Sequence, residues 1–157
     1  MEMPRLIDQF DRVWDGDPWH GHPLKKIIDG VTAEKAAARP IPNGHSIWEI
    51  VLHVAAWEGA VARRLDTGVV DLPEEGDWPE IAQTDPQSWK DTLRHLEEVH
   101  ESLRRSLGRL SDARLEERLG GERNLETGGG VSVATTVHGI IAHSAYHAGQ
   151  IAMLKNA

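Results

Sequence analysis

The sequence contains no cysteine, which excludes disulfides, thiolate metal ligands and cysteine nucleophiles. It also lacks any run of about 18 apolar residues, so we expect no transmembrane helix and no membrane partner. Basic clusters are scarce. The chain has 17 Lys and Arg residues against 25 Asp and Glu residues, which gives a formal net charge of -8. A protein that neutralises phosphates needs a basic face, so we predict no nucleic-acid partner. The first residues are acidic and polar, unlike a secretory signal, and we expect a cytoplasmic protein.

Length and composition are those of one folded domain. The chain has 157 residues, of which 39% are hydrophobic and 27% charged. This is ordinary for a globular protein that buries a core without disulfides, so we expect a single domain over residues 1–157. The nine histidines are then of special interest. Without cysteine, any transition-metal site must be built from imidazole, carboxylate and water.

Apolar residues at spacings of three and four predict long amphipathic helices, and Gly and Pro lie mostly between them. One helix has a clear start, because Ser46 and Glu49 have the spacing of a capping box, and Gly68 suits its C-terminal cap. The polar, proline-containing stretch 71–86 predicts a long loop. No strand pair with a convincing turn is found, so the sequence predicts an all-α fold, an up-down antiparallel four-helix bundle. The expected helices cover roughly residues 4–14 with a short continuation after Pro23, then 46–68, 87–107 and 133–154.

Three histidines on two of these helices have the positions of metal ligands. His143 and His147 are four residues apart on one helical face, with Cβ atoms roughly 5–6 Å apart. Two imidazoles so placed can bind one ion at about 2.0–2.1 Å, and both share the apolar stripe of their helix. His53 lies on the flank of the apolar face of the earlier helix. Any single inward histidine is more often a hydrogen-bonded core residue, but three together predict a site that leaves positions for water, as catalytic sites do.

Two segments resemble the DinB/YfiT-like superfamily. Residues 46–58, SIWEIVLHVAAWE, are similar to its second-helix motif, and residues 138–151, HGIIAHSAYHAGQI, contain its most specific signature. The similarity spans nearly the whole chain. It implies an up-down four-helix bundle, often dimeric, with one divalent metal ion on three histidines, and His53, His143 and His147 match those positions. Relatives include S-transferases and isomerases that use bacillithiol, mycothiol or glutathione, and proteins described as metal-dependent hydrolases.

These features predict a divalent-metal-dependent enzyme that acts on a small molecule, with zinc or nickel as the expected ion. If the nucleophile is a thiol, the enzyme is an S-transferase, and if the nucleophile is water, the enzyme is a hydrolase. The thiol would be a low-molecular-weight cofactor because the chain has no cysteine. The transferase is favoured slightly, since it is the better-attested chemistry in the resembling family. The alternative is a non-enzymatic metal-binding dimer with a stress-related role, which the lack of an obvious fourth ligand disfavours.

The remaining histidines are assigned structural or surface roles. His100 lies at the centre of an apolar stripe and is read as a core residue rather than a ligand. His138 lies on the side of its helix opposite the two ligand candidates. The others are read as loop, cap-flanking or surface residues: His20, His22, His45 and His95.

Residues that support the ligands are harder to assign from sequence. Glu58 and Gln150 are both candidates to orient a ligating histidine, which usually passes its second N–H to a partner. Trp48 and Trp57 flank His53, and either is a candidate wall of the metal pocket. Tyr146 is read as a packing or interface residue. Apolar residues off the main stripe, Val137 and Ile141, suggest a homodimer interface.

Overall fold

The computed structural model describes all of residues 1–157 and is mostly helical, which confirms the all-α class. Its α-helices are α1 (Met3–Asp15), α2 (Leu24–Ile28), α3 (Ala33–Ala37), α4 (Ile47–Thr67), α5 (Pro86–Gly108) and α6 (Val133–Lys155). A 3₁₀ turn, η1 (Asp112–Arg114), and an antiparallel ribbon of β1 (Arg118–Leu119) with β2 (Val131–Ser132) separate α5 from α6. The ribbon was not expected from the sequence, because strands of two residues carry no readable alternation.

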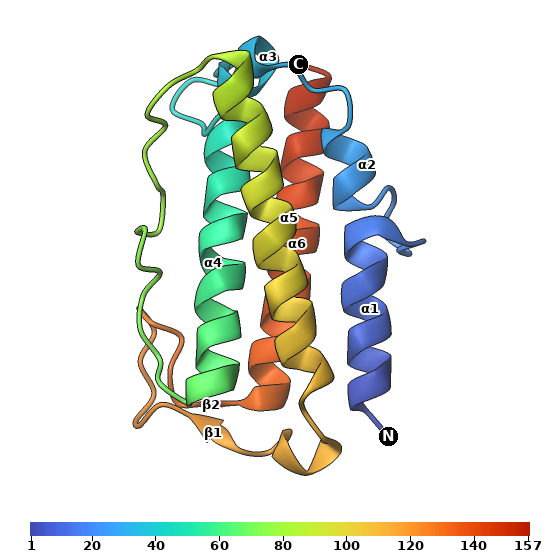
Figure 1. The fold of residues 1–157 in the computed structure, drawn as a ribbon, viewed down its shortest axis with the longest axis vertical. Helices are drawn as coiled ribbons and strands as arrows, with labels where there is room; N and C mark the ends of the chain where they lie inside the picture. Colours follow the sequence, from blue (N-terminus) through green and yellow to red (C-terminus); the bar gives the residue numbers. More distant parts are fainter.

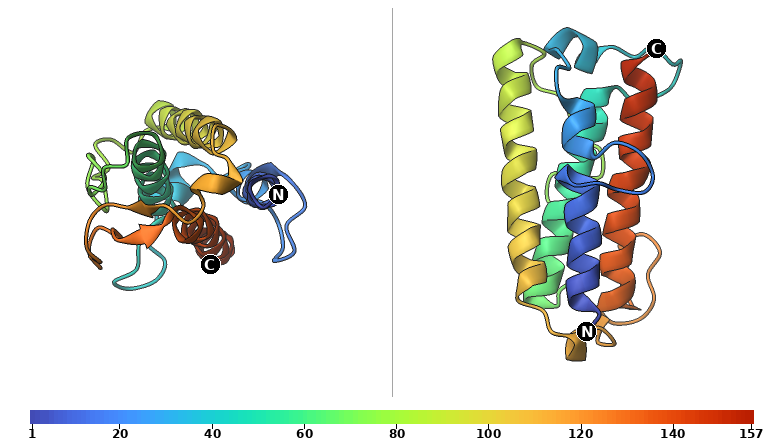
Figure 2. Two further views of the ribbon diagram at one scale, coloured as in Figure 1. Left: turned by 90° about the horizontal axis from the view of Figure 1, so that it is seen from below. Right: turned by 90° about the vertical axis from the view of Figure 1, so that its right-hand side faces the viewer.

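The long helices α4, α5 and α6 lie side by side along the long axis of the molecule (Figure 1). The shorter helices α1 and α2 follow one another in a further column that packs on α5 and α6 (Figure 2). Gly16 and Pro23 separate them, since Gly16 ends α1 and Pro23 precedes the first residue of α2. None of the helices has the length and apolar character that a membrane span requires.

The connection between α4 and α5 differs from the up-down antiparallel order expected from the sequence. In Figure 1 both helices run in the same direction, and residues 68–85 return along the outside of the molecule from the end of α4 to the start of α5. A helix of 21 residues is about 31 Å long, and an extended segment of this size spans that length at about 3.3 Å per residue. The long loop was predicted correctly, but its consequence for helix direction was not.

The caps of α4 fix where His53 lies on the helix. The Ser46 hydroxyl accepts a hydrogen bond from the Glu49 N–H at 3.2 Å, and the Glu49 carboxylate accepts from the Ser46 N–H at 2.7 Å. This is the predicted capping box. Gly68 ends the helix with φ +76°, a left-handed conformation that glycine adopts without strain. With its start fixed in this way, α4 places His53 about two turns in.

The apolar core forms two clusters, one toward each end of the molecule. The first joins α2, α3 and the beginning of α4 to the end of α6, and the second joins α1 and the end of α4 to α5 and the beginning of α6. Half of the eight buried polar side chains lie in the part of α4 and α6 between these clusters: His53, Glu58, Ser144 and His147. Polar chemistry is therefore concentrated in a layer near the middle of the helices.

Candidate metal centre

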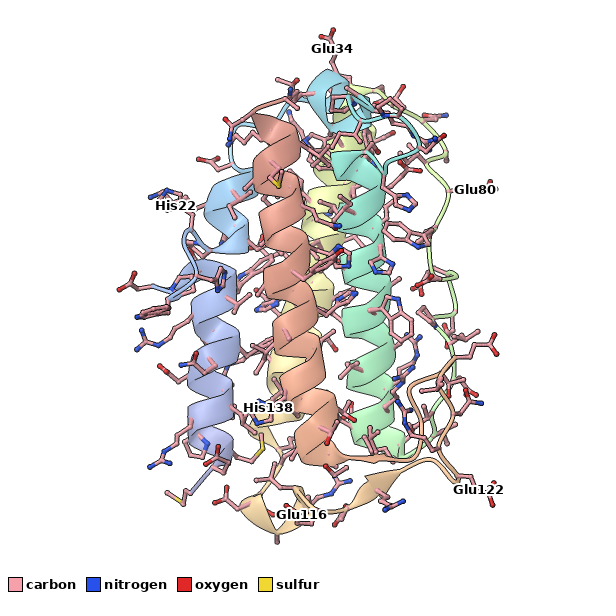
Figure 3. All side chains as sticks on the ribbon, turned by 180° about the vertical axis from the view of Figure 1, so that it is seen from behind. His22, Glu34, Glu80, Glu116, Glu122 and His138 are labelled. Atoms are coloured by element: carbon pink, nitrogen blue, oxygen red, sulfur yellow. The ribbon has the colours of Figure 1, made fainter.

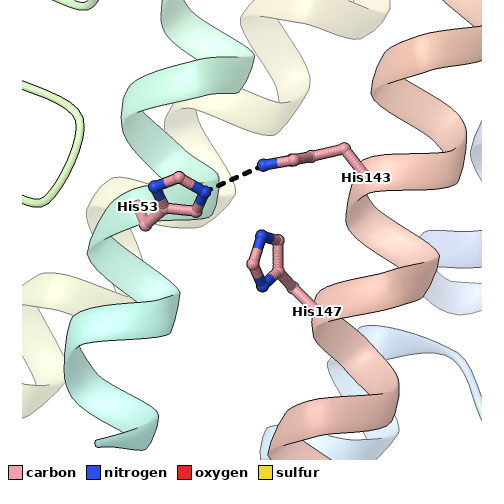
Figure 4. A group of neighbouring side chains, drawn as sticks. All are labelled: His53, His143 and His147. Atoms are coloured by element: carbon pink, nitrogen blue, oxygen red, sulfur yellow. Dashed lines mark hydrogen bonds between the residues drawn. The ribbon is translucent and has the colours of Figure 1, made fainter. Parts of the chain in front are cut away.

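The structure brings the three predicted ligands together. α4 presents His53 toward His143 and His147 of α6, as Figure 4 shows. The Nε2 atoms of His53 and His143 are 2.9 Å apart, and one nitrogen from each of the three rings lies within 4.8 Å of the others. Two nitrogens bound to one ion at 2.0–2.1 Å are at most roughly 4 Å apart, so only small side-chain adjustments are needed. The cluster contains these three imidazoles and no carboxylate.

Hydrogen bonds fix the tautomers of two of the three rings. His53 donates its Nδ1 proton to the Asp77 carbonyl oxygen at 2.6 Å, and His147 donates its Nδ1 proton to Gln150 Oε1 at 2.6 Å. Both acceptors are carbonyl oxygens, which cannot donate, so both Nε2 atoms carry lone pairs. Two lone pairs directed at the same small region are the arrangement that a cation stabilises.

The third ring, His143, provides a test of whether an ion fits. Its Nδ1 is buried and has no hydrogen-bond partner, while its Nε2 faces the lone pair of His53 Nε2. Without an ion, that close contact is favourable only when His143 donates its Nε2 proton. With an ion at that point, the ring proton of His143 would lie on Nδ1, and all three rings would offer a neutral nitrogen at Nε2. Imidazole donors of this kind suit zinc, nickel, copper and iron, so the residues fit a divalent transition ion.

Burial keeps these imidazoles neutral. It is the main cause that lowers the pKa of His143 to about 3, with further lowering from the neighbouring His147 and His53. Burial also lowers the pKa of His53, where Asp77 acts in the opposite direction, and that of His147, where the Gln150 hydrogen bond does so. Metal ligands must be deprotonated, and these three are so at neutral pH.

The long loop covers one side of the cluster. Trp78 stacks on the His53 ring with centroids 4.0 Å apart and also stacks on His45 at 3.5 Å. Asp77 accepts a hydrogen bond from Trp57 Nε1 at 2.7 Å, which pins the loop to α4. Sequence reasoning missed both Asp77 and Trp78. The available signal was one tryptophan inside an otherwise polar stretch.

The two candidate orienting residues have different roles. Gln150 holds His147 as described, and its own Nε2 donates to the Tyr146 hydroxyl at 3.1 Å. Glu58 does not contact the ligand rings but binds His100 and Ser144 in the buried layer. Of the two candidates, Gln150 therefore binds one of the three clustered rings, and Glu58 binds none of them.

Of the two tryptophans considered as walls of the metal pocket, only Trp57 borders the histidine cluster. Its ring lies 6.4 Å from that of His143. Trp48 is buried in the first core cluster, where its Nε1 donates to Thr92. The structure also confirms His100 as a core residue with 5% exposure.

The remaining histidines lie away from the cluster, with one exception. Figure 3 shows His22 in the loop before α2 and His138 near the start of α6, and both are exposed. His20 and His95 are exposed as well. His45 was read as a residue flanking the helix cap, but its stacking on Trp78 brings it to the edge of the site.

A pocket of about 250 Å³ opens beside the cluster, between α4, α6 and the β1–β2 connection. His143 and Trp57 lie on its wall together with Ile140 and Val61. Its volume is just below the range usual for small-molecule sites. A site that only stabilises the fold has no need of such an opening, whereas a reacting molecule requires one.

Comparison with known proteins agrees with the histidine geometry. The family profile described as the DinB superfamily matches residues 19–151, a range that includes all three clustered histidines. No curated protein matches the chain significantly. Because the profile covers most of the sequence, the chain belongs to the DinB superfamily.

Proposed function

We propose that the protein is a divalent-metal-dependent enzyme that acts on a small molecule, with zinc or nickel held by His53, His143 and His147. The observation that carries this proposal is the convergence of three neutral imidazoles beside an open pocket, without a fourth protein ligand in the cluster. A bound ion supplies Lewis acidity there, which lowers the pKa of a water or thiol and produces a nucleophile near neutral pH. The net charge of -8 favours a small-molecule substrate over nucleic acid.

The surrounding residues have definable tasks in this scheme. The Asp77 carbonyl and Gln150 hold the Nδ1 protons of their histidines and so keep each ring in one orientation. Trp78 covers the His53 ring and excludes water from that side. The pocket beside His143 leaves the opposite approach open to substrate.

Counting α1 and α2 as one interrupted helix, we propose a single-domain four-helix bundle in which α4 and α5 run in parallel.

The chemistry we favour is transfer to or from a small thiol, with hydrolysis as the second candidate. Because the chain has no cysteine, the sulfur nucleophile must be brought by a cosubstrate. Incubating metal-loaded protein with several low-molecular-weight thiols and a panel of electrophiles should yield a thioether or thioester adduct, read by mass spectrometry. The apo protein should give only the uncatalysed background. Hydrolysed electrophile without adduct would favour the hydrolase, and background rates with bound metal would favour the non-enzymatic metal-binding role.

We also propose a homodimer that uses the exposed face of α6. Tyr146 and Met153 are 64% and 73% exposed there, with the small Ala142 and Gly149 on the same face. Val137, suggested for this role by the sequence, is instead fully buried in the core. A helix face that combines large apolar and small side chains can pack closely against a copy of itself.

Sedimentation at micromolar concentration is therefore expected to give twice the chain mass of 17.4 kDa. Met153→Glu should shift the protein toward monomer because it places a charge within the proposed interface. His95→Glu, a charge change at an exposed position of α5, should leave the dimer intact. A monomer mass for the unmodified protein would contradict the proposal.

A further inference from the structure

A buried arginine without an anionic partner lies in the pocket beside the histidine cluster. Arg64 is only 5% exposed. Its Nη2 donates to the Asp71 carbonyl at 2.8 Å, while its Nε is buried and has no partner. No carboxylate oxygen lies within 4.0 Å of its nitrogens, in contrast to the neighbouring Arg63, which pairs with Glu74. Arginine is rarely buried unless paired, because a charge removed from water is costly when nothing compensates it.

The position of Arg64 links it to the metal centre. It follows His53 by 11 residues, about three helical turns, and so lies on the same side of α4. Its guanidinium carbon is 5.2 Å from the centre of the Trp57 ring, and that ring in turn borders His143. Arg64 and His143 line the same pocket. A small molecule in this pocket can therefore contact the arginine and the histidine cluster together.

The charge of the pocket differs from that of the whole protein. Two arginines, Arg64 and Arg123, line it and no acidic residue does, although the chain carries a net charge of -8. Thr135 and Thr136 add hydroxyls from the first turn of α6, the positive end of that helix. A small positive pocket in an acidic protein concentrates anions at that place.

The hydrogen bond from Arg64 to the loop after α4 does not explain why a charged side chain is needed at this position. The hydrogen bond to Asp71 holds the segment after α4, and it uses one of the five N–H donors of the guanidinium. A neutral donor could hold the same carbonyl at a lower desolvation cost. Burial lowers the pKa of Arg64 from its ordinary value, which reflects that same cost, and the charge of Asp71 offsets only part of this lowering. A ligand that supplies further negative charge in direct contact with the guanidinium would explain why a full cation is placed here.

We propose that this pocket binds the anionic oxygen group, a carboxylate or phosphate, of the small molecule that reacts at the histidine cluster. Arg64 is the main recognition residue, because its planar fork matches either group, and Arg123 lies at the mouth. That the bound molecule is also the reactant rests on the proposed function. Binding of an anion in the pocket does not depend on that function. The substrate class is thus a small thiol or electrophile with an acidic group at one end.

A glycine in the pocket wall provides a way to close it. A Cβ atom added at Gly139 would meet no atom within 4 Å, although this residue lines the pocket one turn before His143. A side chain introduced here meets open space at the pocket wall and does not displace the core. Replacement of a helical glycine also favours the helix. Gly139→Leu is therefore expected to fold and to retain metal while it occludes the anion site.

The test uses the zinc-loaded protein and a series of ω-mercaptocarboxylates of increasing chain length, each compared with its neutral amide by calorimetry. One chain length should bind at least about tenfold more tightly as the acid than as the amide, the effect of a charge-assisted hydrogen bond. Arg64→Gln should remove this preference, because the acid loses its charged partner, and it should weaken binding of the amide far less. Gly139→Leu should remove it too, which covers the case in which the Arg64 variant does not fold. A preference that is absent, or that survives both substitutions, overturns the proposal.

A metal-free experiment separates this proposal from the proposed function. Glutarate and inorganic phosphate are titrated into the apo protein, and the indole N–H signal of Trp57 is followed by NMR because its ring lies against Arg64. A saturable shift that Arg64→Gln abolishes supports the anion site. This holds even if no thiol binds the zinc-loaded protein, because the absence of thiol binding would count only against the thiol chemistry. Failure of both anions to shift the signal, together with equal affinity for acid and amide, would contradict the site itself.

Discussion

Reconstitution of the metal-free protein with zinc or nickel is expected to give one ion per chain and to raise the melting temperature by about 5–10 °C. An ion that binds only the folded chain stabilises it by about 2.7 kcal/mol when free ion is a hundredfold above Kd. In a chain of 157 residues each kcal/mol corresponds to roughly 2–4 °C. Elemental analysis and calorimetry measure the two quantities independently.

The same experiment on two histidine variants locates the site. His147→Ala leaves two of the three clustered rings and should remove most of the metal-induced increase. His138→Ala changes an exposed histidine on the same helix and should preserve it. If His138→Ala abolished the increase while His147→Ala retained it, the ion would be bound elsewhere.

The pH dependence of the metal-induced increase in melting temperature follows from the lowered pKa values of the three clustered histidines. The unfolded chain takes up protons near pH ~6.5, whereas the folded cluster does so only at lower pH, and His143 at about 3. The apo protein is therefore most stable above about pH 6.5 and loses stability as the pH falls toward 3. Protons compete less with the ion than they do at exposed histidines, because all three pKa values are lowered, so the metal-induced increase should persist below the ordinary histidine pKa of about 6.5. A steep loss of the increase near pH 6.5 would show that the clustered rings titrate as exposed histidines do.

The parts of the site that could be predicted from the sequence are those that depend on local helical geometry. His143 and His147 share a face whatever surrounds them, because residues four apart on a helix are neighbours. The start of α4 is equally local, since Ser46 and Glu49 form its capping box with each other. These two facts leave little freedom in how His53 can face α6.

The parts that could not be predicted depend on where a loop lies in space. Asp77 and Trp78 reach His53 because the loop returns along the outside of α4, and no periodicity encodes that path. The parallel direction of α4 and α5 has the same origin. Arg64 is a different case, because its spacing from His53 is visible in the sequence but its burial is not. Arginine usually extends its charged end to water, so the sequence gives no reason to expect a buried cation.

The second large effect concerns Glu58, which lies in the polar layer but outside the metal cluster. Its carboxylate is 1% exposed, accepts a hydrogen bond from Ser144 Oγ at 3.1 Å, and lies 3.0 Å from His100 Nδ1. It thereby joins α4 to both α5 and α6. The His100 ring also stacks on Phe10 and Trp14 of α1, at 4.4 Å and 4.1 Å. One side chain thus connects all the long helices at the level where the apolar core is interrupted.

Glu58→Ala is expected to destabilise the protein by roughly 3–5 kcal/mol, because it leaves two buried donors without an acceptor and opens a cavity. At this chain length the melting temperature should fall by about 6–20 °C, measured by calorimetry on the apo protein. Replacing both partners, in Glu58→Leu with His100→Leu, should recover much of this loss, since a buried pair can be exchanged for apolar side chains at little cost. Together with the single variants Glu58→Leu and His100→Leu, the double variant completes a cycle that measures the coupling between the two residues.

Metal content distinguishes this role of Glu58 from an effect on the metal centre. Glu58→Gln keeps the size of the side chain and one acceptor oxygen, so it should fold with a smaller loss of stability. Because Glu58 binds none of the three clustered histidines, the folded variant should still take up one ion per chain. A folded Glu58→Gln protein that cannot bind metal would show that the carboxylate acts on the site through Ser144, the residue next to His143. A melting temperature for Glu58→Ala within about 2 °C of the unmodified protein would show that the buried contacts contribute no net stability.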